Sequence, residues 1–477
     1  MNATRKERTP LGGRDAVVTC RNSQGFEVRA TPVRMTRFNI VFEVYNPYSI
    51  LQLSEVLSDF RITIGERLAY AGRAVVSNLV NAGFMLLCEA TLEEAWFDVD
   101  LFSPISQRER LHDELQAFLQ ECGKIGAIEP EFKVVVADMQ VLLADLRHWL
   151  EQLELGIRSI SAGDRAAFER EVISDTREPL MTEIDALFGR FEGVAAKLAP
   201  ETQSMHRSYM RRQLHPLVLC APFPYRTFHK PLGYAGDYEM VNMLLRDPLE
   251  GASLFAKMVN LWFLSQAPAL AHRNRIIYLR QRLREEVQRV AGLGRRVRIL
   301  NLGCGPAAEI QQFLTEEALC DQADFLLLDF NDETLEYTRQ RLEGLKGAHR
   351  RQTGLGFLKK SVHQLLKEAG RPDPEAGRYD LVYCAGLFDY LSDRICQRLM
   401  NILYDQVAPG GLLISTNVDP SNPLRNGMEY LLEWHLIYRD QQQMKLLHPT
   451  ASGPGDIRTL SDESGVNIYL EVRKPAG

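Results

Sequence analysis

A glycine-rich turn between an apolar run and a helical pattern places the strongest constraint on the fold. Residues 296–310 read RVRILNLGCGPAAEI. Because Gly303 and Gly305 lack a Cβ, the turn can be sharp and its backbone amides can approach a ligand, with the N-terminus of the following helix facing the same point. The pattern predicts a cofactor-binding strand-loop-helix unit. A tight connection that binds no ligand is the alternative interpretation.

A second buried-strand pattern, FLLLDFND at residues 325–332, supports the cofactor interpretation. It contains Asp329, roughly 20 residues after the glycines, where nucleotide-binding α/β folds place a carboxylate that accepts hydrogen bonds from ribose hydroxyls. Further strand patterns occur at residues 356–358, 379–384 and 411–416, with helical patterns between them. This alternation predicts a doubly wound α/β domain with a parallel sheet.

The C-terminal region, from about Met205 onward, resembles class I S-adenosylmethionine-dependent methyltransferases. The resemblance lies in the successive motifs LGCGPAAE, LLLDFND, YDLVYCAGLFDYL and APGGLLIST. Within that superfamily, HKPLGYAGDYEMVNML (residues 229–244), GLFDYLSD and EWHLIYRD are similar to bacterial proteins assigned to 3-hydroxy fatty acid methyl ester biosynthesis, a quorum-sensing signal. The resemblance implies a Rossmann-like fold, S-adenosyl-L-methionine as cofactor, and methylation of a carboxyl group on an acid such as 3-hydroxypalmitic acid.

The same resemblance assigns the cofactor site. It implies that the methionine end, ribose, adenine and closing cap are contacted by Gly303, Cys304, Gly305, Pro306, Asp329, Phe330, Ser361, Val362, Gly386, Phe388, Tyr234 and Asp237. The chain departs from the common glycine loop at Asn301, where an acid is usual, and at Ala307, where a third glycine is usual. We expect the Asp237 carboxylate to pair with the methionine ammonium in place of the missing acid.

The resemblance also assigns the acceptor side of the site. It places Asp389 and Tyr390 beside the transferred methyl group and Tyr238 on the substrate side. A predicted helix at residues 433–439, together with the loop after the fifth strand, would supply the substrate-binding residues Asn417, Trp434, His435, Tyr438 and Arg439. Simple core packing is the alternative for that helix. The sequence shows no obvious general base, which favours an acid substrate because a carboxylate is already ionised at neutral pH.

The first hundred residues predict a small β-barrel, since short strand patterns alternate with turn residues. The patterns lie at residues 15–20, 26–31, 39–45, 60–64, 67–79 and 83–90. This region resembles PilZ-type domains, which often bind cyclic di-GMP. However, Arg34 and Arg37 are only three apart, and SNLVNAG at residues 77–83 is a distant match to the second binding motif. The sequence therefore favours a docking or structural barrel over dinucleotide binding.

Helical periodicity dominates between about residues 101 and 199. The apolar stripes are Leu111, Leu115, Phe118 and Leu119; Val135, Met139, Leu142, Leu143, Leu146 and Leu150; and Leu180, Ile184, Leu187, Phe188 and Phe191. Breaks are expected at Pro130, Gly163 and Pro179. We predict a helical bundle that links barrel and catalytic domain, forms part of a homodimer or covers a lipid pocket. The predicted domains are residues 1–98, 99–204 and 205–477, with a capping segment at 226–245.

Composition excludes several other classes of protein. The 477 residues carry a net charge of −6 and no basic run, so no nucleic-acid partner is expected. No apolar run is long enough for a membrane span and residues 1–16 lack a signal-peptide core, so we expect a cytosolic protein. The eight cysteines and ten histidines show no metal-ligand spacing, so neither a metal nor a disulfide framework is expected.

Two alternatives to a fatty acid methyltransferase stay open. The first is a methyltransferase that acts on another hydroxyl, amine or carboxyl acceptor, such as a natural-product intermediate. The second is a regulatory protein whose barrel receives a signal and whose C-terminal domain binds the cofactor without turnover. The intact glycine loop and Asp329 argue against a domain that has lost cofactor binding.

Overall fold

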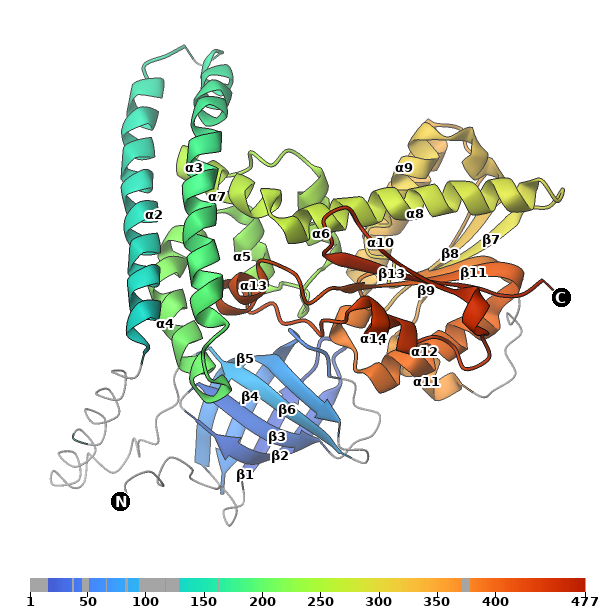
Figure 1. Ribbon diagram of the computed structural model, residues 1–477, viewed down its shortest axis with the longest axis horizontal. Coiled ribbons are helices and arrows are strands. Elements are labelled where there is room, and N and C mark those ends of the chain that lie inside the picture. The colour runs from blue at the N-terminus through green and yellow to red at the C-terminus, as the bar shows by residue number, and fades with distance from the viewer. Residues whose placement is uncertain are drawn as a thin grey trace.

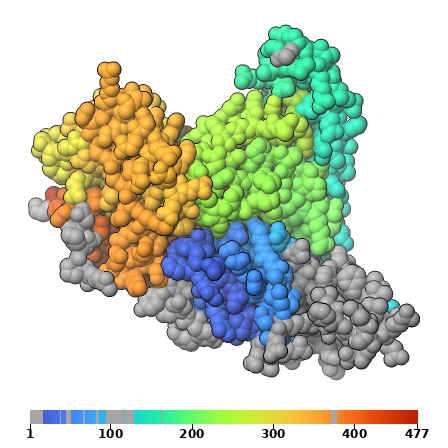
Figure 2. All heavy atoms as spheres, turned by 180° about the vertical axis from the view of Figure 1, so that it is seen from behind, coloured from blue at the N-terminus to red at the C-terminus, as the bar shows by residue number. Residues whose placement is uncertain are grey.

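The chain folds into a barrel, a helical region and an α/β domain, which pack against one another (Figures 1 and 2). The computed structural model describes residues 16–476 except 37, 45–50, 66, 82–84, 94–115, 117–127, 162 and 370–377. The predicted helical stripe from Leu111 to Leu119 and the predicted barrel residue Arg37 lie outside the described residues. The space-filling view shows the barrel in contact with both the helical region and the α/β domain (Figure 2).

The N-terminal region is a closed antiparallel barrel with strand order β1-β2-β3-β6-β5-β4, as the sequence predicts. Inward residues alternate with outward ones along β2, because successive side chains of a strand point to opposite faces. Phe42, Phe60 and Ile62 fill the interior. The strands are β1 (Ala16–Arg21), β2 (Glu27–Met35), β3 (Asn39–Val44), β4 (Val56–Ile64), β5 (Arg67–Asn81) and β6 (Leu86–Leu92).

The helical region is built on two long helices, α2 (Pro130–Ile157) and α3 (Arg165–Ala195). Pro130 opens α2 and Gly163 lies between the two helices, as predicted, but the break expected at Pro179 is wrong. Pro179 lies inside α3 on its exposed side, where the carbonyl of residue 175, which loses its usual partner, can reach water. One hydrophobic core joins these helices to α4 (Pro200–Val218), α5 (Pro222–His229), α6 (Tyr238–Leu245), α7 (Leu254–Ser265) and α13 (Arg425–Leu432).

The C-terminal region holds a seven-stranded sheet in the order β12-β13-β11-β10-β7-β8-β9. The five strands from β9 to β11 are parallel, whereas β13 is antiparallel to both β11 and β12. Counted along the chain, the parallel part has the doubly wound order 3-2-1-4-5. The strands are β7 (Val297–Leu302), β8 (Ala323–Asp329), β9 (Gly354–Lys359), β10 (Tyr379–Cys384), β11 (Val407–Val418), β12 (Ile457–Ser461) and β13 (Asn467–Arg473).

Helices cover both faces of this sheet, which explains why β7 and β10 are almost continuously apolar. One face packs against α8 (Ala267–Ala291), α9 (Ala308–Glu316) and α10 (Asp332–Ala348). The other packs against α11 (Val362–Glu368), α12 (Asp393–Gln406) and α14 (Gln441–Leu446). The doubly wound prediction is confirmed. The antiparallel strands β12 and β13 were not predicted.

No helix in the described part of the chain is both long and apolar enough to cross a membrane. The domain boundary at residues 204/205 stays a prediction, and helix α4 runs across it.

Candidate functional site

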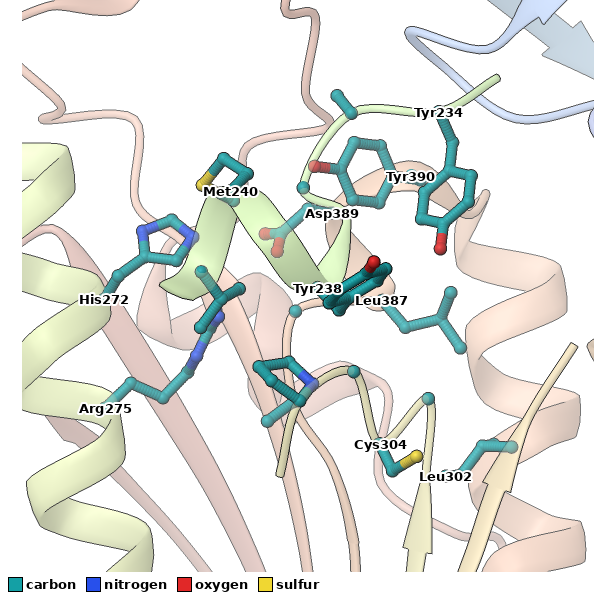
Figure 3. A pocket seen from close by; sticks show the side chains of 18 of the residues that line it. Tyr234, Tyr238, Met240, His272, Arg275, Leu302, Cys304, Leu387, Asp389 and Tyr390 are labelled. Atoms are coloured by element: carbon teal, nitrogen blue, oxygen red, sulfur yellow. The ribbon is translucent and has the colours of Figure 1, made fainter. Parts of the chain in front are cut away.

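The main cavity opens at the carboxyl ends of β7, β8 and β10, where the strand order reverses between β7 and β10 (Figure 3). Open α/β sheets bind their ligands at this switch point. The sequence-predicted residues that line the cavity are Tyr234, Tyr238, Gly303, Cys304, Gly305, Pro306, Asp329, Phe330, Ser361, Val362, Gly386, Asp389, Tyr390 and Trp434. The fold therefore gathers most of the predicted site residues around one space.

The glycine loop joins β7 to α9 in a conformation that suits small residues. Gly303 and Gly305 have φ angles of 68° and 50°, and Ala307 has one of 51°, so all three are left-handed. The amides of Gly303 and Cys304 both donate to the carbonyl of Leu328, at 2.8 and 3.0 Å. No described atom lies within 4 Å of where a Cβ on Gly305 would stand. The loop is thus pinned to β8 and leaves open space for a ligand.

Asp329 ends β8 as a buried carboxylate at the cavity wall. Its oxygens accept hydrogen bonds from the amides of Gly305 (3.2 Å) and Asn331 (3.0 Å). Burial raises the pKa of this carboxyl to about 6, and the amide donors oppose that shift. The amide of Lys360 donates to the carbonyl of Asp329 at 2.9 Å. This hydrogen bond places the next residue, Ser361, which caps the N-terminus of α11, beside Asp329. This arrangement offers acceptors for ribose hydroxyls next to a loop that can contact a base.

We expect cofactor affinity to depend on the protonation of Asp329. Above pH 7 the carboxylate is ionised and accepts from hydroxyls, whereas at pH 5 only about a tenth of it is ionised, so affinity should fall about tenfold. The raised pKa favours the folded protein as pH falls through 6, so this group does not itself cause unfolding. Calorimetric titration of the protein with the cofactor at both pH values checks the prediction. Thermal unfolding at the same pH values is the control, because it shows that the protein stays folded. An affinity independent of pH would contradict it.

Asp237 does not face the cavity, contrary to its predicted role. Asp237 caps the N-terminus of α6, where its carboxylate accepts a hydrogen bond from the amide of Met240 (2.8 Å). Both carboxylate oxygens also pair with the guanidinium of Arg226, at 2.9 Å. Glu309, in the first turn of α9, lines the cavity instead and accepts from Asn301 (3.2 Å) and Tyr383 (2.7 Å). Burial raises the Glu309 pKa. An acid directly after the glycine loop is the sequence signal that could have identified it.

The acceptor end of the cavity contains Tyr390 and Asp389, both from the turn after β10, η3 (Phe388–Tyr390). The Nε1–H of Trp434 donates to the hydroxyl oxygen of Tyr390 at 2.9 Å. Asp389 accepts from the amide of Val418 at 2.7 Å, and burial raises its pKa. Tyr238 also lines the cavity and is stacked on Tyr337 of α10, with ring centroids 4.5 Å apart.

Two lining residues that the sequence interpretation missed, His272 and Arg275, reach the cavity from α8 (Figure 3). Nδ1 of His272 lies 2.8 Å from the carbonyl of Pro268, so it donates there and leaves Nε2 as an acceptor. Burial, and then the charge of Arg275, lower the pKa of His272 to about 3. The imidazole is therefore neutral at physiological pH.

Arg275 is a buried cation whose charge acts on the nearby carboxyls of Asp389 and Glu309, where it opposes the rise of their pKa. It is 9% exposed, and within the described ranges it makes no hydrogen bond or ion pair. Its guanidinium lies against Gly386, whose φ of 86° suits glycine and where a Cβ would stand 3.0 Å from a guanidinium nitrogen. Burying an unpaired guanidinium is costly, and such a group at a cavity wall is suited to bind an anionic ligand. No sequence pattern marks it, because its position depends on how α8 packs on the sheet.

The prediction of a helix at residues 433–439 is wrong. Helix α13 ends at Leu432 because Glu433 adopts a left-handed conformation, and the next residues, up to 440, belong to no helix or strand. Their amides pair outside any helix: Ile437 donates to the carbonyl of Asp389 (2.7 Å) and Arg439 to that of Val418 (3.1 Å). Trp434 and Tyr438 therefore do not share a helix face, and only Trp434 lines the cavity.

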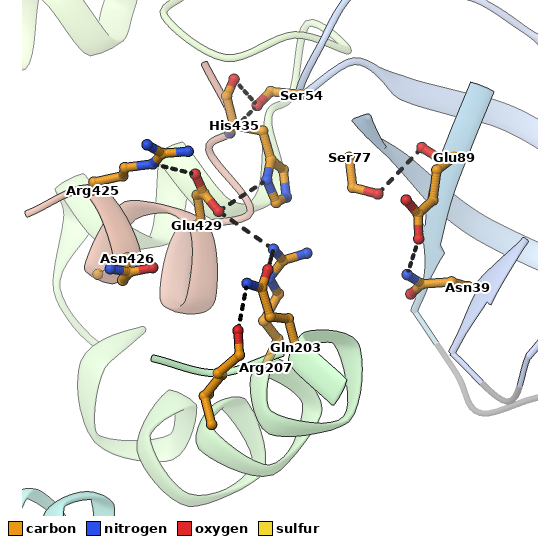
Figure 4. Close-up of polar contacts among 12 residues, drawn as sticks. Asn39, Ser54, Ser77, Glu89, Gln203, Arg207, Arg425, Asn426, Glu429 and His435 are labelled. Atoms are coloured by element: carbon orange, nitrogen blue, oxygen red, sulfur yellow. Dashed lines mark hydrogen bonds and ion pairs between the residues drawn. The ribbon is translucent and has the colours of Figure 1, made fainter. Parts of the chain in front are cut away.

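Five other predicted site residues lie behind the wall rather than on it. Phe388 belongs to the core on the α12 face of the sheet. Arg439 is buried and donates to Asn417, Asp393 and two carbonyls of the turn after β10. His435 contacts Ser54 and Glu429 (Figure 4), and Tyr438 packs under the guanidinium of Arg425. The structure thus places Phe388, Asn417, His435, Tyr438 and Arg439 as supports of the site.

Among the described residues, no cluster of three or more His, Cys, Asp or Glu side chains could hold a metal ion.

Comparison with known proteins gives partial structural likeness only. No protein family model matches the chain, and no curated protein matches it. A possible exported protein from Bordetella parapertussis aligns at 18% identity over 62% of this chain and 97% of its own, with a TM-score of 0.41. The N-methyltransferase NodS from Bradyrhizobium japonicum WM9, bound to S-adenosyl-L-homocysteine, aligns at 15% identity over 50% and 98%, with a TM-score of 0.31.

Magnesium protoporphyrin IX methyltransferase from Synechocystis PCC 6803, also bound to S-adenosylhomocysteine, aligns at 11% identity over 43% of this chain and 84% of its own, with a TM-score of 0.30. Likeness at these scores carries no argument about function. The proposed function therefore depends on the cavity of this chain.

Proposed function

We propose that this protein is an S-adenosylmethionine-dependent methyltransferase that methylates the carboxylate of an apolar acid. The observation that carries the proposal is one cavity with two chemically different ends. One end combines the left-handed glycine loop with the buried Asp329. The other combines Arg275, which makes no hydrogen bond or ion pair with a described residue, with the buried Asp389 and a largely apolar wall.

The residues at the first end fit the cofactor. The open space over Gly305 admits the methionine portion, and Asp329 offers acceptors for ribose hydroxyls. Glu309 is the buried acid suited to the ammonium, which replaces the role proposed from sequence for Asp237. The rings of Phe330 and Tyr234 have centroids 5.1 Å apart, and the Phe330 ring is suited to stack on the face of the adenine. When bound, the cofactor supplies an electrophilic methyl group.

The acceptor end fits a carboxylate on an apolar chain. The guanidinium of Arg275 can hold a carboxylate through two parallel hydrogen bonds. Behind His272 the cavity adjoins a smaller apolar chamber, which shares Met240, Met428 and Trp434 with it and is also lined by Phe223, Leu244, Phe263, Leu424 and Leu432. The apolar lining favours an alkyl chain over a polar group, in keeping with the 3-hydroxy fatty acid class proposed from the sequence resemblance. Because the chamber holds only about 20 Å³ of free space, its side chains would have to move to admit such a chain.

The chemistry needs positioning more than proton transfer. A carboxylate is ionised at neutral pH, so the reaction needs no base. His272, with its pKa of about 3, is a poor base, but its Nε2 can accept a hydrogen bond from a substrate hydroxyl. Tyr390, Trp434 and Met240 would exclude water and hold the nucleophile in line with the methyl group.

The test uses two acceptors that differ only in the reacting group. The purified protein is incubated with methyl-labelled S-adenosylmethionine and either 3-hydroxypalmitate or 3-hydroxypalmitamide, and products are identified by mass spectrometry. We expect labelled methyl ester from the acid and no labelled product from the amide. Label on the hydroxyl oxygen, or transfer to the amide, would contradict carboxyl methylation.

A further inference from the structure

The barrel packs against both neighbouring regions (Figure 2) and contributes to the wall of the cavity. The amide of Val56 donates to the carbonyl of Gly233 at 2.7 Å, which ties β4 to the segment before α6. The hydroxyl of Ser54 donates to the carbonyl of His435 at 2.9 Å (Figure 4). Arg73 of β5 pairs with Glu433 at 2.9 Å. These contacts fix the barrel against both segments that flank the acceptor end.

Two barrel glutamines, Gln24 and Gln52, lie in the cavity wall. Gln24 belongs to the β1–β2 turn. Gln52 lies between Leu51 and Leu53, which belong to the barrel core, and it lines the cavity. In the part of the chain that the structure describes, neither side-chain amide has a hydrogen-bond partner. Both are therefore available to a ligand.

One buried carboxylate holds the two glutamine-bearing segments together. The Glu55 carboxylate accepts hydrogen bonds from the backbone amide and the hydroxyl of Ser23, at 2.7 and 2.5 Å. It also accepts from the backbone amide of Gln52 at 2.8 Å. It is 1% exposed. Glu55 is thus a positioning residue that orients both turns toward the cavity.

The β1–β2 turn lies at the end of the cavity assigned to adenine. Phe26 of this turn contacts His363 of α11, with ring centroids 6.0 Å apart, and α11 begins directly after Ser361. Tyr234 follows Gly233, where a Cβ would stand 3.2 Å from the Cβ of Ser23. The turn therefore meets both the capping segment and the adenine end.

We propose that the barrel completes the cofactor site. The side-chain amide of Gln24 binds the adenine edge, and that of Gln52 binds the cofactor from the same wall of the cavity. A carboxamide presents one donor and one acceptor side by side, which matches the amino donor and ring-nitrogen acceptor of adenine. This inference rests on the proposed cofactor. It assigns the barrel a direct part in binding, whether or not it also receives a signal.

The test is calorimetric titration of the full chain with S-adenosylhomocysteine and with its inosine analogue, which replaces the adenine amino group by a carbonyl. The variants are Gln24→Ala, Gln52→Ala and, as matched control, Gln281→Ala on the outer side of α8. We expect each barrel variant to bind S-adenosylhomocysteine about threefold to tenfold more weakly, because each loses one or two neutral hydrogen bonds. Gln281→Ala should bind like the wild type.

The analogue separates direct contact from a structural effect. The wild type should prefer S-adenosylhomocysteine over the inosine analogue, and Gln24→Ala should lose most of that preference. Wild-type affinity in both barrel variants, or an unchanged preference in Gln24→Ala, would overturn the inference. If the wild-type protein itself bound no S-adenosylhomocysteine, the proposed function would fail first.

Discussion

Replacing Asp329 with alanine should weaken binding of S-adenosylhomocysteine at least about 100-fold. Hydrogen bonds to a charged group contribute roughly 1.5–3 kcal/mol each, and the ribose offers two hydroxyls to this carboxylate. The same carboxylate accepts from the amides of Gly305 and Asn331, so its removal also loosens the glycine loop. Both effects lower affinity. Calorimetric titration of the folded variant measures the change.

The control is Asp332→Ala, three residues further along the chain. Asp332 is 76% exposed and pairs with Lys359 at the surface. It should leave affinity unchanged, because an exposed ion pair contributes little. Wild-type affinity in Asp329→Ala would show that the nucleoside binds somewhere other than the carboxyl end of β8.

Replacing Arg275 with methionine should lower kcat/KM for the acid acceptor by a factor on the order of 10² to 10³. Truncating one partner of a buried charge pair costs about 2–5 kcal/mol, much of it from the carboxylate left unpaired. Arg275→Lys should restore only part of the activity, because a lysine keeps the charge but not the two-pronged geometry. Steady-state kinetics with varied acceptor measure both variants.

Stability and cofactor affinity distinguish this role from others. Because Arg275 makes no hydrogen bond or ion pair within the described residues, and methionine removes only its charge interaction with Asp389, the melting temperature should change little. Arg280→Met, on the same helix, removes only a contact to Glu316 and should keep full activity. If Arg275→Met lost affinity for S-adenosylhomocysteine while KM for the acid stayed constant, the guanidinium would serve the cofactor's carboxylate instead.

Local pattern was enough for the parts of the site that lie within one strand-loop-helix unit. The glycines at 303 and 305 and the acid at 329 could be predicted because period and spacing place them at the ends of β7 and β8. The barrel strands could be predicted because alternation and turn residues are local as well.

What the sequence did not reveal depends on how elements pack. Arg275 and Gln52 reach the cavity only because α8 and the barrel lie where they do, and no periodicity reports that. The helix expected from Trp434 onward failed because tertiary hydrogen bonds, such as that from Ile437 to Asp389, outweigh its helical spacing. Asp237 was misassigned because its partner, Arg226, is brought to it by the turn between α5 and α6.

A crystal structure of the protein with bound S-adenosylhomocysteine would show where the nucleoside and the methionine portion lie. We predict that the ribose hydroxyls contact Asp329 and that the adenine lies between Phe330 and α11, within reach of Gln24. The ammonium of the amino-acid portion should face Glu309. The sulfur should face the end of the cavity that holds Asp389 and Arg275. Ligand density elsewhere on the chain, or the reverse orientation within this cavity, would show that the glycine loop and Asp329 do not form the cofactor site.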